Sequence, residues 1–282
     1  MNEQQSKSQP HLLNLACGAK VSTVGNWANI DFSSPMENVI EMNILNGLTF
    51  PDGSFDAVYT AQFVEHLTPQ ETAVVLREIH RVLKPGGVLR IVTPDMEELA
   101  RTYLKHLDQL KRNDDADEAN KYDWVRIEIF DQIVRDYSGG ELKEFVEHCD
   151  ESMKAYLSER IGYTFTSFSA PRQSRRNYAS MSGLLRVLKK VPKKLVRMIA
   201  DRVESKTKKV GRFRQSGEVH RYMHDVYSLA RLLRAEGFSS ITRVDPYTSS
   251  ISDWGMYELD VIKGQPDGPL ALYVEARKPQ VA

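Results

Sequence analysis

The sequence predicts an α/β protein with a doubly wound parallel sheet, and three observations indicate it. Short apolar runs bounded by turn residues alternate with helical patterns, the order that gives a parallel sheet. The first run, residues 12–16, leads into Gly18, and the second ends at the carboxylate of Asp31. Open sheets of this kind bind ligands beyond the carboxyl ends of their strands. We therefore expect a ligand site along that edge.

Five strands are expected in the first third of the chain, over residues 12–16, 28–31, 39–42, 55–60 and 88–93. Residues 69–83 carry apolar side chains every three to four positions, which predicts a helix with Thr68 as its N-cap. The KPGG that follows should end this helix and turn the chain into the next strand. Twelve residues separate Gly18 from Asp31, so we expect a turn or irregular loop there rather than a crossover helix.

Composition indicates a chain with a real core and no global charge bias. Its 282 residues, 41% of them hydrophobic, suit one large domain or one domain with an insertion. Lys+Arg and Asp+Glu both number 38, so nucleic-acid binding is not indicated. Two cysteines make neither a disulfide framework nor a metal knuckle. Residues 1–10 are polar and no apolar run could span a bilayer, so we expect a cytoplasmic protein.

Residues at the ends of the first two strands are predicted to bind a nucleotide. The loop Ala16-Cys17-Gly18 contains a glycine, which allows close approach of the backbone to a ligand. Asp31 can accept hydrogen bonds from both hydroxyls of a ribose. The alternatives are an ordinary strand-turn for the loop and a turn or helix cap for Asp31.

The third and fourth strands end in further candidates. Asn43 could accept a hydrogen bond from the amine of an adenine ring, with Ile44 covering the ring face. A simple turn-forming role for Asn43 stays open. Gln62 and Phe63 follow the fourth strand, and Phe63 could pack on the nucleotide.

His66 is the candidate general base, because its ordinary pKa lies near neutrality and it stands at the same edge. The alternative is a structural histidine that orients its loop through Glu65. Glu65 and Asp95 are also candidates for contact with an acceptor. No ligand spacing argues for a metal ion, although Asp95, Glu65 and His66 could share one.

Four segments, LNLACG, NWANID, FPDGSFDAVYTAQFVEHL and EIHRVLKPGGVLRIVTPD, together resemble the class I S-adenosylmethionine (SAM) dependent methyltransferases. The resemblance implies a Rossmann-like sheet of seven strands in the order 3-2-1-4-5-7-6, with SAM as cofactor. Two departures are visible, since that family usually has glycine at the position of Ala16 and aspartate at that of Asn43. Alignment of donor and acceptor is the main task in such a reaction, so an enzyme without a nucleophile is expected.

More narrowly, these segments with VEHL and LYVEARKP resemble a bacterial subgroup associated with surface polysaccharide and glycolipid biosynthesis. That resemblance implies O-methylation of a saccharide or glycolipid precursor. Two alternatives stay open. One is methylation of another small-molecule hydroxyl, of the polyketide or quinone type, and the other is a SAM-binding partner protein without turnover.

Residues 96–217 are predicted to form a helical insertion between two parts of a SAM-binding domain, residues 11–95 and 218–282, after a flexible N-terminus at 1–10. Residues 95–160 hold 18 Asp+Glu and 10 Lys+Arg, and the helix expected over residues 122–141 could cap the substrate mouth or merely pack on the sheet.

Residues 172–214 reverse this sign, with 15 Lys+Arg and two acids. Within them, residues 182–206 are amphipathic, apolar on one face and cationic on the other. They could contact the inner face of a membrane, bind a phosphate-rich partner, or pack on the domain.

The chain is expected to return to the sheet through a helix over residues 220–238, followed by a final antiparallel strand pair. His220 and Tyr222 would then stand near the ligand edge, as candidates for contact with the acceptor. The alternative for His220 is a residue at the start of a helix. The sequence does not specify an oligomeric state.

Overall fold

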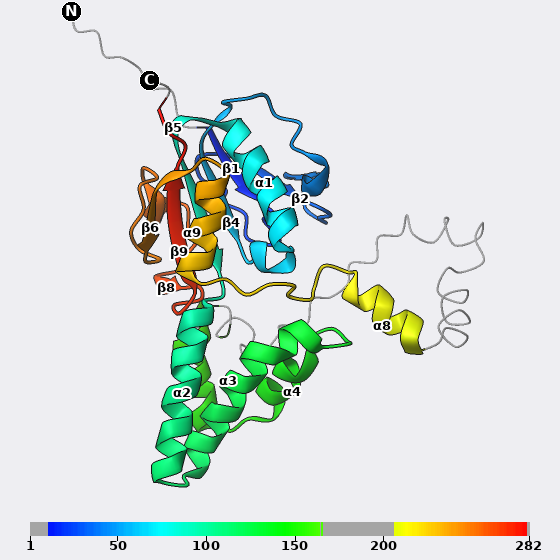
Figure 1. Ribbon diagram of the computed structural model, residues 1–282, viewed down its shortest axis with the longest axis vertical. Coiled ribbons are helices and arrows are strands. Elements are labelled where there is room, and N and C mark those ends of the chain that lie inside the picture. Colours follow the sequence, from blue (N-terminus) through cyan, green and yellow to red (C-terminus); the bar gives the residue numbers. More distant parts are fainter. Residues whose placement is uncertain (1–10, 164, 166–205, 281–282) are drawn as a thin grey trace, which may run out of the picture.

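The computed structural model describes residues 11–163, 165 and 206–280 (Figure 1). Its core is a seven-stranded sheet in the order β3-β2-β1-β4-β5-β9-β6, the predicted order with β9 as the last strand along the chain. The first five strands pair in parallel, and β9 runs antiparallel to both β5 and β6. The strands are β1 (His11–Leu15), β2 (Asn26–Asp31), β3 (Val39–Glu41), β4 (Phe55–Ala61), β5 (Leu83–Thr93), β6 (Ser239–Val244) and β9 (Leu272–Arg277).

One face of the sheet is covered by two helices, α1 (Pro69–Val82) and α9 (Val226–Ala235). Alternate side chains of the strands point to this face, as the two-residue period of a strand requires, and pack against the apolar stripes of both helices. Thr68 caps α1 in a capping box with Glu71, as the sequence predicts for its start. No helix joins β1 to β2, which confirms the loop expected between them.

The opposite face of the sheet is covered by the segment between β6 and β9. This segment contains η5 (Trp254–Met256) and a small hairpin of β7 (Val261–Ile262) and β8 (Gln265–Pro266). Trp254 and Tyr257 pack there on Tyr59 and other residues of the central strands. The fold is therefore wound with helices on one side and with this irregular segment on the other.

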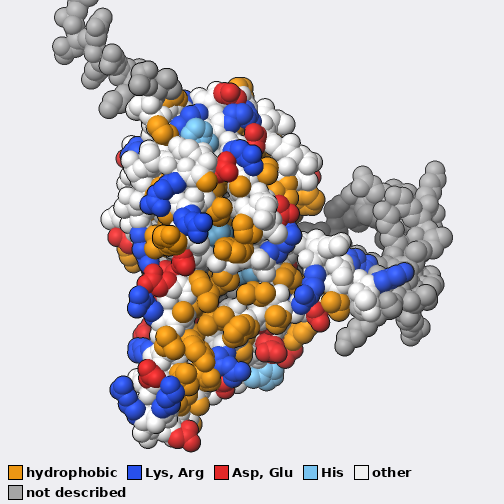
Figure 2. Space-filling view, viewed as in Figure 1, with side chains coloured by type: hydrophobic (Ala, Val, Ile, Leu, Met, Phe, Trp, Pro, Cys, Tyr) orange, Lys and Arg blue, Asp and Glu red, His pale blue; other side chains and the backbone are white. Residues whose placement is uncertain are grey.

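The insertion leaves the sheet after β5 as a separate lobe (Figure 1). It contains α2 (Met96–Arg112), α3 (Ala116–Val134), α4 (Gly140–His148) and α5 (Glu151–Ile161). These helices enclose their own core around Leu99, Trp124 and Leu157. Figure 2 shows further hydrophobic side chains on the outer face of this lobe.

Two predicted helices differ from the structure. The helix expected over 122–141 is α3, which ends at Val134, and Gly139 in a left-handed conformation starts α4 instead. The helix expected from His220 begins at Val226, because Asp225 caps it and the preceding residues run beside Asp95 as a β-bridge.

A further helix, α8 (Lys206–Arg214), precedes the return of the chain to the sheet. The predicted amphipathic segment 182–206 lies outside the described residues except for its last position. Among the helices that the structure describes, none has the length and apolar character needed to cross a membrane.

Candidate functional site

The loop after β1 is held against the sheet by a buried asparagine. Asn14, which is 1% exposed, donates through Nδ2 to the carbonyl of Lys20 at 2.7 Å and to Oδ1 of Asn29 at 3.0 Å. Gly18 in this loop has φ +53, and a Cβ built on it would meet no atom within 4 Å. The loop is thus fixed at its base and open at Gly18, as a backbone that approaches a ligand must be.

Asp31 stands at the end of β2 and faces this loop. Its Oδ2 accepts a hydrogen bond from the Gly18 amide at 2.7 Å, and its Oδ1 lies 3.4 Å from the Ser33 amide. The neighbouring Cys17 is buried, and burial followed by the charge of Asp31 raises the pKa of its thiol to about 11. Cys17 is therefore a neutral packing residue at physiological pH.

The ends of β3 and β4 lie at the same edge of the sheet as Gly18 and Asp31. We call these four strand ends, with the loops that follow them, the rim. Asn43 caps η1 (Ile44–Asn46) by accepting a hydrogen bond from the Leu45 amide at 3.1 Å, so it has the turn-forming role that was the alternative. Ile44 is buried, and Phe63 packs partly buried against the core. Gln62 has φ +52 and donates its amide to the Val92 carbonyl at 2.9 Å, which holds the start of this loop on β5.

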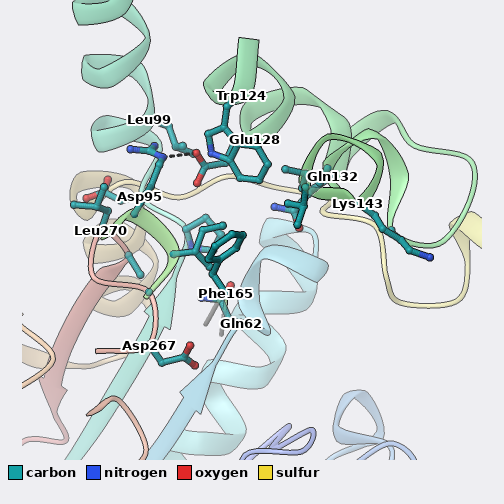
Figure 3. A pocket seen from close by; sticks show the side chains of 18 of the residues that line it. Gln62, Asp95, Leu99, Trp124, Glu128, Gln132, Lys143, Phe165, Asp267 and Leu270 are labelled. Carbon is teal, nitrogen blue, oxygen red and sulfur yellow. Dashed lines mark hydrogen bonds and ion pairs between the residues drawn. The ribbon is translucent and has the colours of Figure 1, made fainter. Parts of the chain in front are cut away.

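A cavity of about 860 Å³ lies between the sheet edge and the insertion (Figure 3). Gln62 and Pro94 belong to the sheet edge, and Leu270 and Ala271 to the loop before β9. The insertion contributes most of the apolar wall, with Leu99, Trp124, Leu142, Val146, Ile161 and Phe165. The volume lies within the usual range for small-molecule sites.

Five carboxylates that line the cavity each have a cationic partner. The pairs are Asp95–Arg243 (2.7 Å), Glu128–Arg160 (2.6 Å), Glu147–Lys143 (3.8 Å), Glu218–Arg135 (3.4 Å) and Asp267–Lys20 (2.7 Å). Burial raises the pKa of Glu128, and the guanidinium of Arg160 opposes this effect. Among the described residues that line the cavity, the two cations Lys143 and Arg160 are each paired with a carboxylate.

Comparison with known proteins identifies a family for the stretch that contains these strand ends. Residues 17–91 match the family model described as "Methyltransferase domain", a stretch that runs from the loop after β1 through Asp31 to β5. The chain contains a SAM-dependent methyltransferase domain. Gly18 and Asp31 both lie within this matched stretch, at the carboxyl ends of β1 and β2. The fold and cofactor expected from the resemblance are thereby confirmed.

Curated relatives of the methyltransferase domain match parts of the chain. A demethylmenaquinone methyltransferase of Listeria monocytogenes is 27% identical over 188 residues, which cover 56% of this chain and 76% of that protein. A ubiquinone/menaquinone biosynthesis C-methyltransferase UbiE of Pseudoalteromonas translucida is 36% identical over 87 residues. The probable methyltransferase ltbC of Aspergillus luteorubrus is 46% identical over 50 residues. The chain spans 31% and 18% of the lengths of these last two proteins.

Solved structures have also been compared with the chain. A SAM-dependent methyltransferase from Archaeoglobus fulgidus aligns with a TM-score of 0.40 and 13% identity, over 96% of this chain and 87% of that one. A SAM-dependent methyltransferase from Methanosarcina mazei gives a TM-score of 0.40 and 14% identity, over 97% and 94%.

Several residues predicted to contact the acceptor lie elsewhere in the methyltransferase fold. Glu65 is fully buried, His220 is 5% exposed, and neither they nor Tyr222 line the cavity. Glu65 lies within η2 (Val64–His66), and the contact of Glu65, His220 and Tyr222 with an acceptor stays a prediction. Asp95 does line the cavity, but its carboxylate caps α2 and pairs with Arg243.

His66 is not among the residues that line the cavity. Its Nδ1 lies 3.3 Å from the Val219 carbonyl, and its ring meets that of His220 edge to face. Burial is the first cause that lowers the pKa of both rings, that of His220 to about 3. The catalytic role of His66 stays a prediction.

The sequence analysis did not predict the asparagine that holds the loop after β1 or the residues of the insertion that line the cavity. Asn14 is a polar residue inside the apolar run LLNLA, and that interruption was the available signal. Trp124 and the Glu128–Arg160 pair come from two helices of the insertion, 32 residues apart for the charged pair, so no local pattern connects them. Their grouping depends on the packing of α3 on α5.

Proposed function

We propose that the protein transfers the methyl group of SAM to a hydroxyl of a small, uncharged, amphipathic acceptor. The observation that carries the proposal is the cavity, which adjoins the methyltransferase rim at Gln62 and has largely apolar walls. An acceptor in this cavity would lie beyond the carboxyl ends of β4 and β5, on the side where the domain would present SAM. The insertion then acts as the cap of the acceptor site.

The donor side would be held by the first three strand ends. Backbone groups around Gly18 would contact the methionine part of SAM, and Asp31 would accept hydrogen bonds from the ribose hydroxyls. Ile44 and Phe63 would cover the adenine ring. SAM supplies an activated methyl group, so the protein contributes chiefly by aligning the acceptor and excluding water.

The walls of the cavity favour an acceptor with an apolar ring or chain. Trp124, Leu99 and Phe165 would gain contact area on such a group, while both cations among the described lining residues already have carboxylate partners. A quinone- or polyketide-type hydroxyl fits this description. The Listeria relatives are demethylmenaquinone methyltransferases, which supports a quinone-type acceptor. The Pseudoalteromonas relative is a C-methyltransferase, so product analysis must distinguish a ring carbon from a hydroxyl as the methylated atom.

A saccharide or glycolipid acceptor is the second candidate, and one feature favours it. Glu98 lines the cavity, and its Oε1 accepts a hydrogen bond from the Thr102 hydroxyl at 3.0 Å. The carboxylate could also accept a hydrogen bond from a sugar hydroxyl in the cavity that Trp124 lines. A glycolipid would use both the carboxylate and the apolar wall. A nucleotide sugar suits the cavity less well, because of its phosphates.

Cofactor binding is tested with the Asp31→Ala variant and S-adenosylhomocysteine in a calorimeter. Loss of charge-assisted hydrogen bonds should weaken binding by roughly 10- to 100-fold. Glu37→Ala removes an exposed acid from the loop after β2 and serves as the matched control, with unchanged affinity. Equal affinity of the Asp31→Ala variant and wild type would contradict the assignment of the rim.

Acceptor class is tested with a labelled-methyl screen of quinols, polyketide phenols, lipid-linked glycans and free sugars. The proposal expects transfer to neutral amphipathic hydroxyls, and Leu270→Trp should abolish it by filling the cavity while S-adenosylhomocysteine still binds. Product analysis identifies the methylated atom, and a carbon–methyl bond would overturn the O-methyl assignment. An unchanged rate in His66→Ala would leave alignment as the catalytic contribution.

A further inference from the structure

Three side chains with metal-binding chemistry come together where η2 meets the stretch that returns from the insertion. One ligand atom each from Glu65, His66 and His220 lies within 4.8 Å of the other two. The rings of His66 and His220 meet edge to face, with centroids 4.8 Å apart. Glu65 is 0% and His220 5% exposed, so this cluster is built into the interior rather than gathered on the surface.

Two atoms of the cluster are buried without a hydrogen-bond partner. Glu65 accepts from the Thr93 hydroxyl through Oε2 at 3.0 Å, which leaves Oε1 without a partner. Nδ1 of His220 is likewise buried and unpartnered. Because buried polar atoms are almost always hydrogen-bonded, two such atoms in side chains of one compact cluster point to a ligand bound there.

The third member is oriented in the same way. Nδ1 of His66 lies 3.3 Å from the Val219 carbonyl, so the ring donates there and carries its lone pair on Nε2. Glu65 and His66 thus each have one polar atom hydrogen-bonded within the protein, and the second polar atom is available to bind a ligand. Held outer atoms of this kind are what orient the ligands of metal sites.

We propose that Glu65, His66 and His220 bind one divalent transition-metal ion of the zinc type. Two imidazole nitrogens and one carboxylate oxygen form a donor set that suits zinc, with the fourth position left for water. The positive charge of Arg135 helps to lower the pKa of both histidines, but its guanidinium is paired with Glu218 at 3.4 Å. That pairing offsets the positive charge that would otherwise oppose a cation.

The ion would join segments that are far apart in the sequence. Glu65 and His66 belong to η2, directly after β4, whereas His220 belongs to the stretch that returns from the insertion. The amide of His220 donates to the Gln132 carbonyl of α3 at 2.8 Å, and the Arg221 amide donates to the Glu65 carbonyl at 2.7 Å. A metal at this point would fix the insertion relative to the methyltransferase rim.

Zinc titration of untagged, EDTA-treated protein tests the site by calorimetry. We expect one equivalent of Zn²⁺ to bind to wild type, and Glu65→Gln or His220→Asn to weaken binding at least tenfold. His148→Gln removes an exposed histidine of α4 and should leave the affinity unchanged. Absence of stoichiometric binding, or equal affinity in wild type and Glu65→Gln, would overturn the proposal.

A spectroscopic measurement on wild type keeps the test valid if the variants fail to fold. Co²⁺ added to the stripped protein should give the intense visible bands of a four-coordinate ion, and Zn²⁺ should displace them. The weak spectrum of hydrated Co²⁺ would overturn the proposal. Neither readout requires an acceptor or turnover, so the metal site can fail while the proposed function stands.

Discussion

Ala16 adopts a left-handed backbone conformation, with φ +55, where β1 ends and the loop that contains Gly18 begins. A residue with a Cβ is strained there by about 1 kcal/mol or more, whereas glycine is not. Ala16→Gly should therefore keep or raise the free energy of unfolding, by at most about 1 kcal/mol. Urea denaturation measures this, with Ala28→Gly in β2 as the control that should destabilise. Equal destabilisation by both changes would contradict the argument.

His224 gives the protein an acid-sensitive interior. It is 0% exposed, both ring nitrogens lack partners, and burial lowers its pKa to about 4. Folding thus disfavours protonation of His224. The contribution of neutral His224 to stability is complete above about pH 6.5 and is lost as pH falls toward 4. The loss should reach roughly 3 kcal/mol.

Denaturant titrations between pH 7 and 4 measure this effect. His224→Leu should remove this part of the pH dependence and leave the part that buried His220 contributes. It should stay close to wild type at pH 7, since it removes a buried polar group without leaving a partner unpaired. His148→Gln, at an exposed position, should keep the wild-type profile. A wild-type profile in His224→Leu would show that another group controls acid unfolding.

At the scale of elements, Arg90 of β5 anchors the irregular segment that covers the second face of the sheet. Its fully buried guanidinium contacts Asp260 at 2.7 Å, Glu275 at 2.9 Å and the Thr248 carbonyl at 2.9 Å. The ring of Trp254 lies 4.7 Å away. One side chain therefore holds residues of both this segment and β9.

Arg90→Met should lower the free energy of unfolding by about 3–5 kcal/mol, because it leaves two buried carboxylates uncompensated. Lys84→Met on the same strand breaks an ion pair with Asp56 in which both side chains are two-fifths exposed, and should cost about 1 kcal/mol or less. Chemical denaturation compares the two. Similar small losses in both variants would mean that Arg90 is not the anchor.

The elements that sequence patterns locate are those with local causes. Runs of buried apolar residues placed the parallel strands to within a few residues, and the Thr68 cap placed the start of α1. KPGG was expected as a turn, yet the structure extends β5 back to Leu83, because pairing with Phe55 continues past an irregularity. The covering segment around Trp254 was not predicted, since Arg90 lies 155 residues or more from its partners there.

At the scale of the molecule, the insertion is a separate unit on an intact core. It has its own apolar cluster, and both its ends meet where the Met96 amide donates to the His224 carbonyl at 2.9 Å. Replacing residues 98–218 by a flexible Gly/Ser linker should therefore leave S-adenosylhomocysteine binding within about tenfold of wild type. Methyl transfer to the acceptor should disappear with the cavity.

Calorimetry and the labelled-methyl assay measure these two outcomes on the same preparation, with circular dichroism as the check that the core has folded. A folded core that no longer binds S-adenosylhomocysteine would contradict this division. The rim could be predicted from sequence because its residues follow consecutive strands. The cavity could not, because its wall is assembled from helices whose mutual packing no local pattern records.

The joint between Asp95 and His224 has an evolutionary consequence. Since the polypeptide departs from the core and rejoins it at one spot, inserts of other sizes could be accommodated there without altering the order of the strands. Descendants of one ancestral donor-binding module could diversify their targets by exchanging this single stretch. Homologues that share the rim yet differ between these two residues would then methylate different compounds.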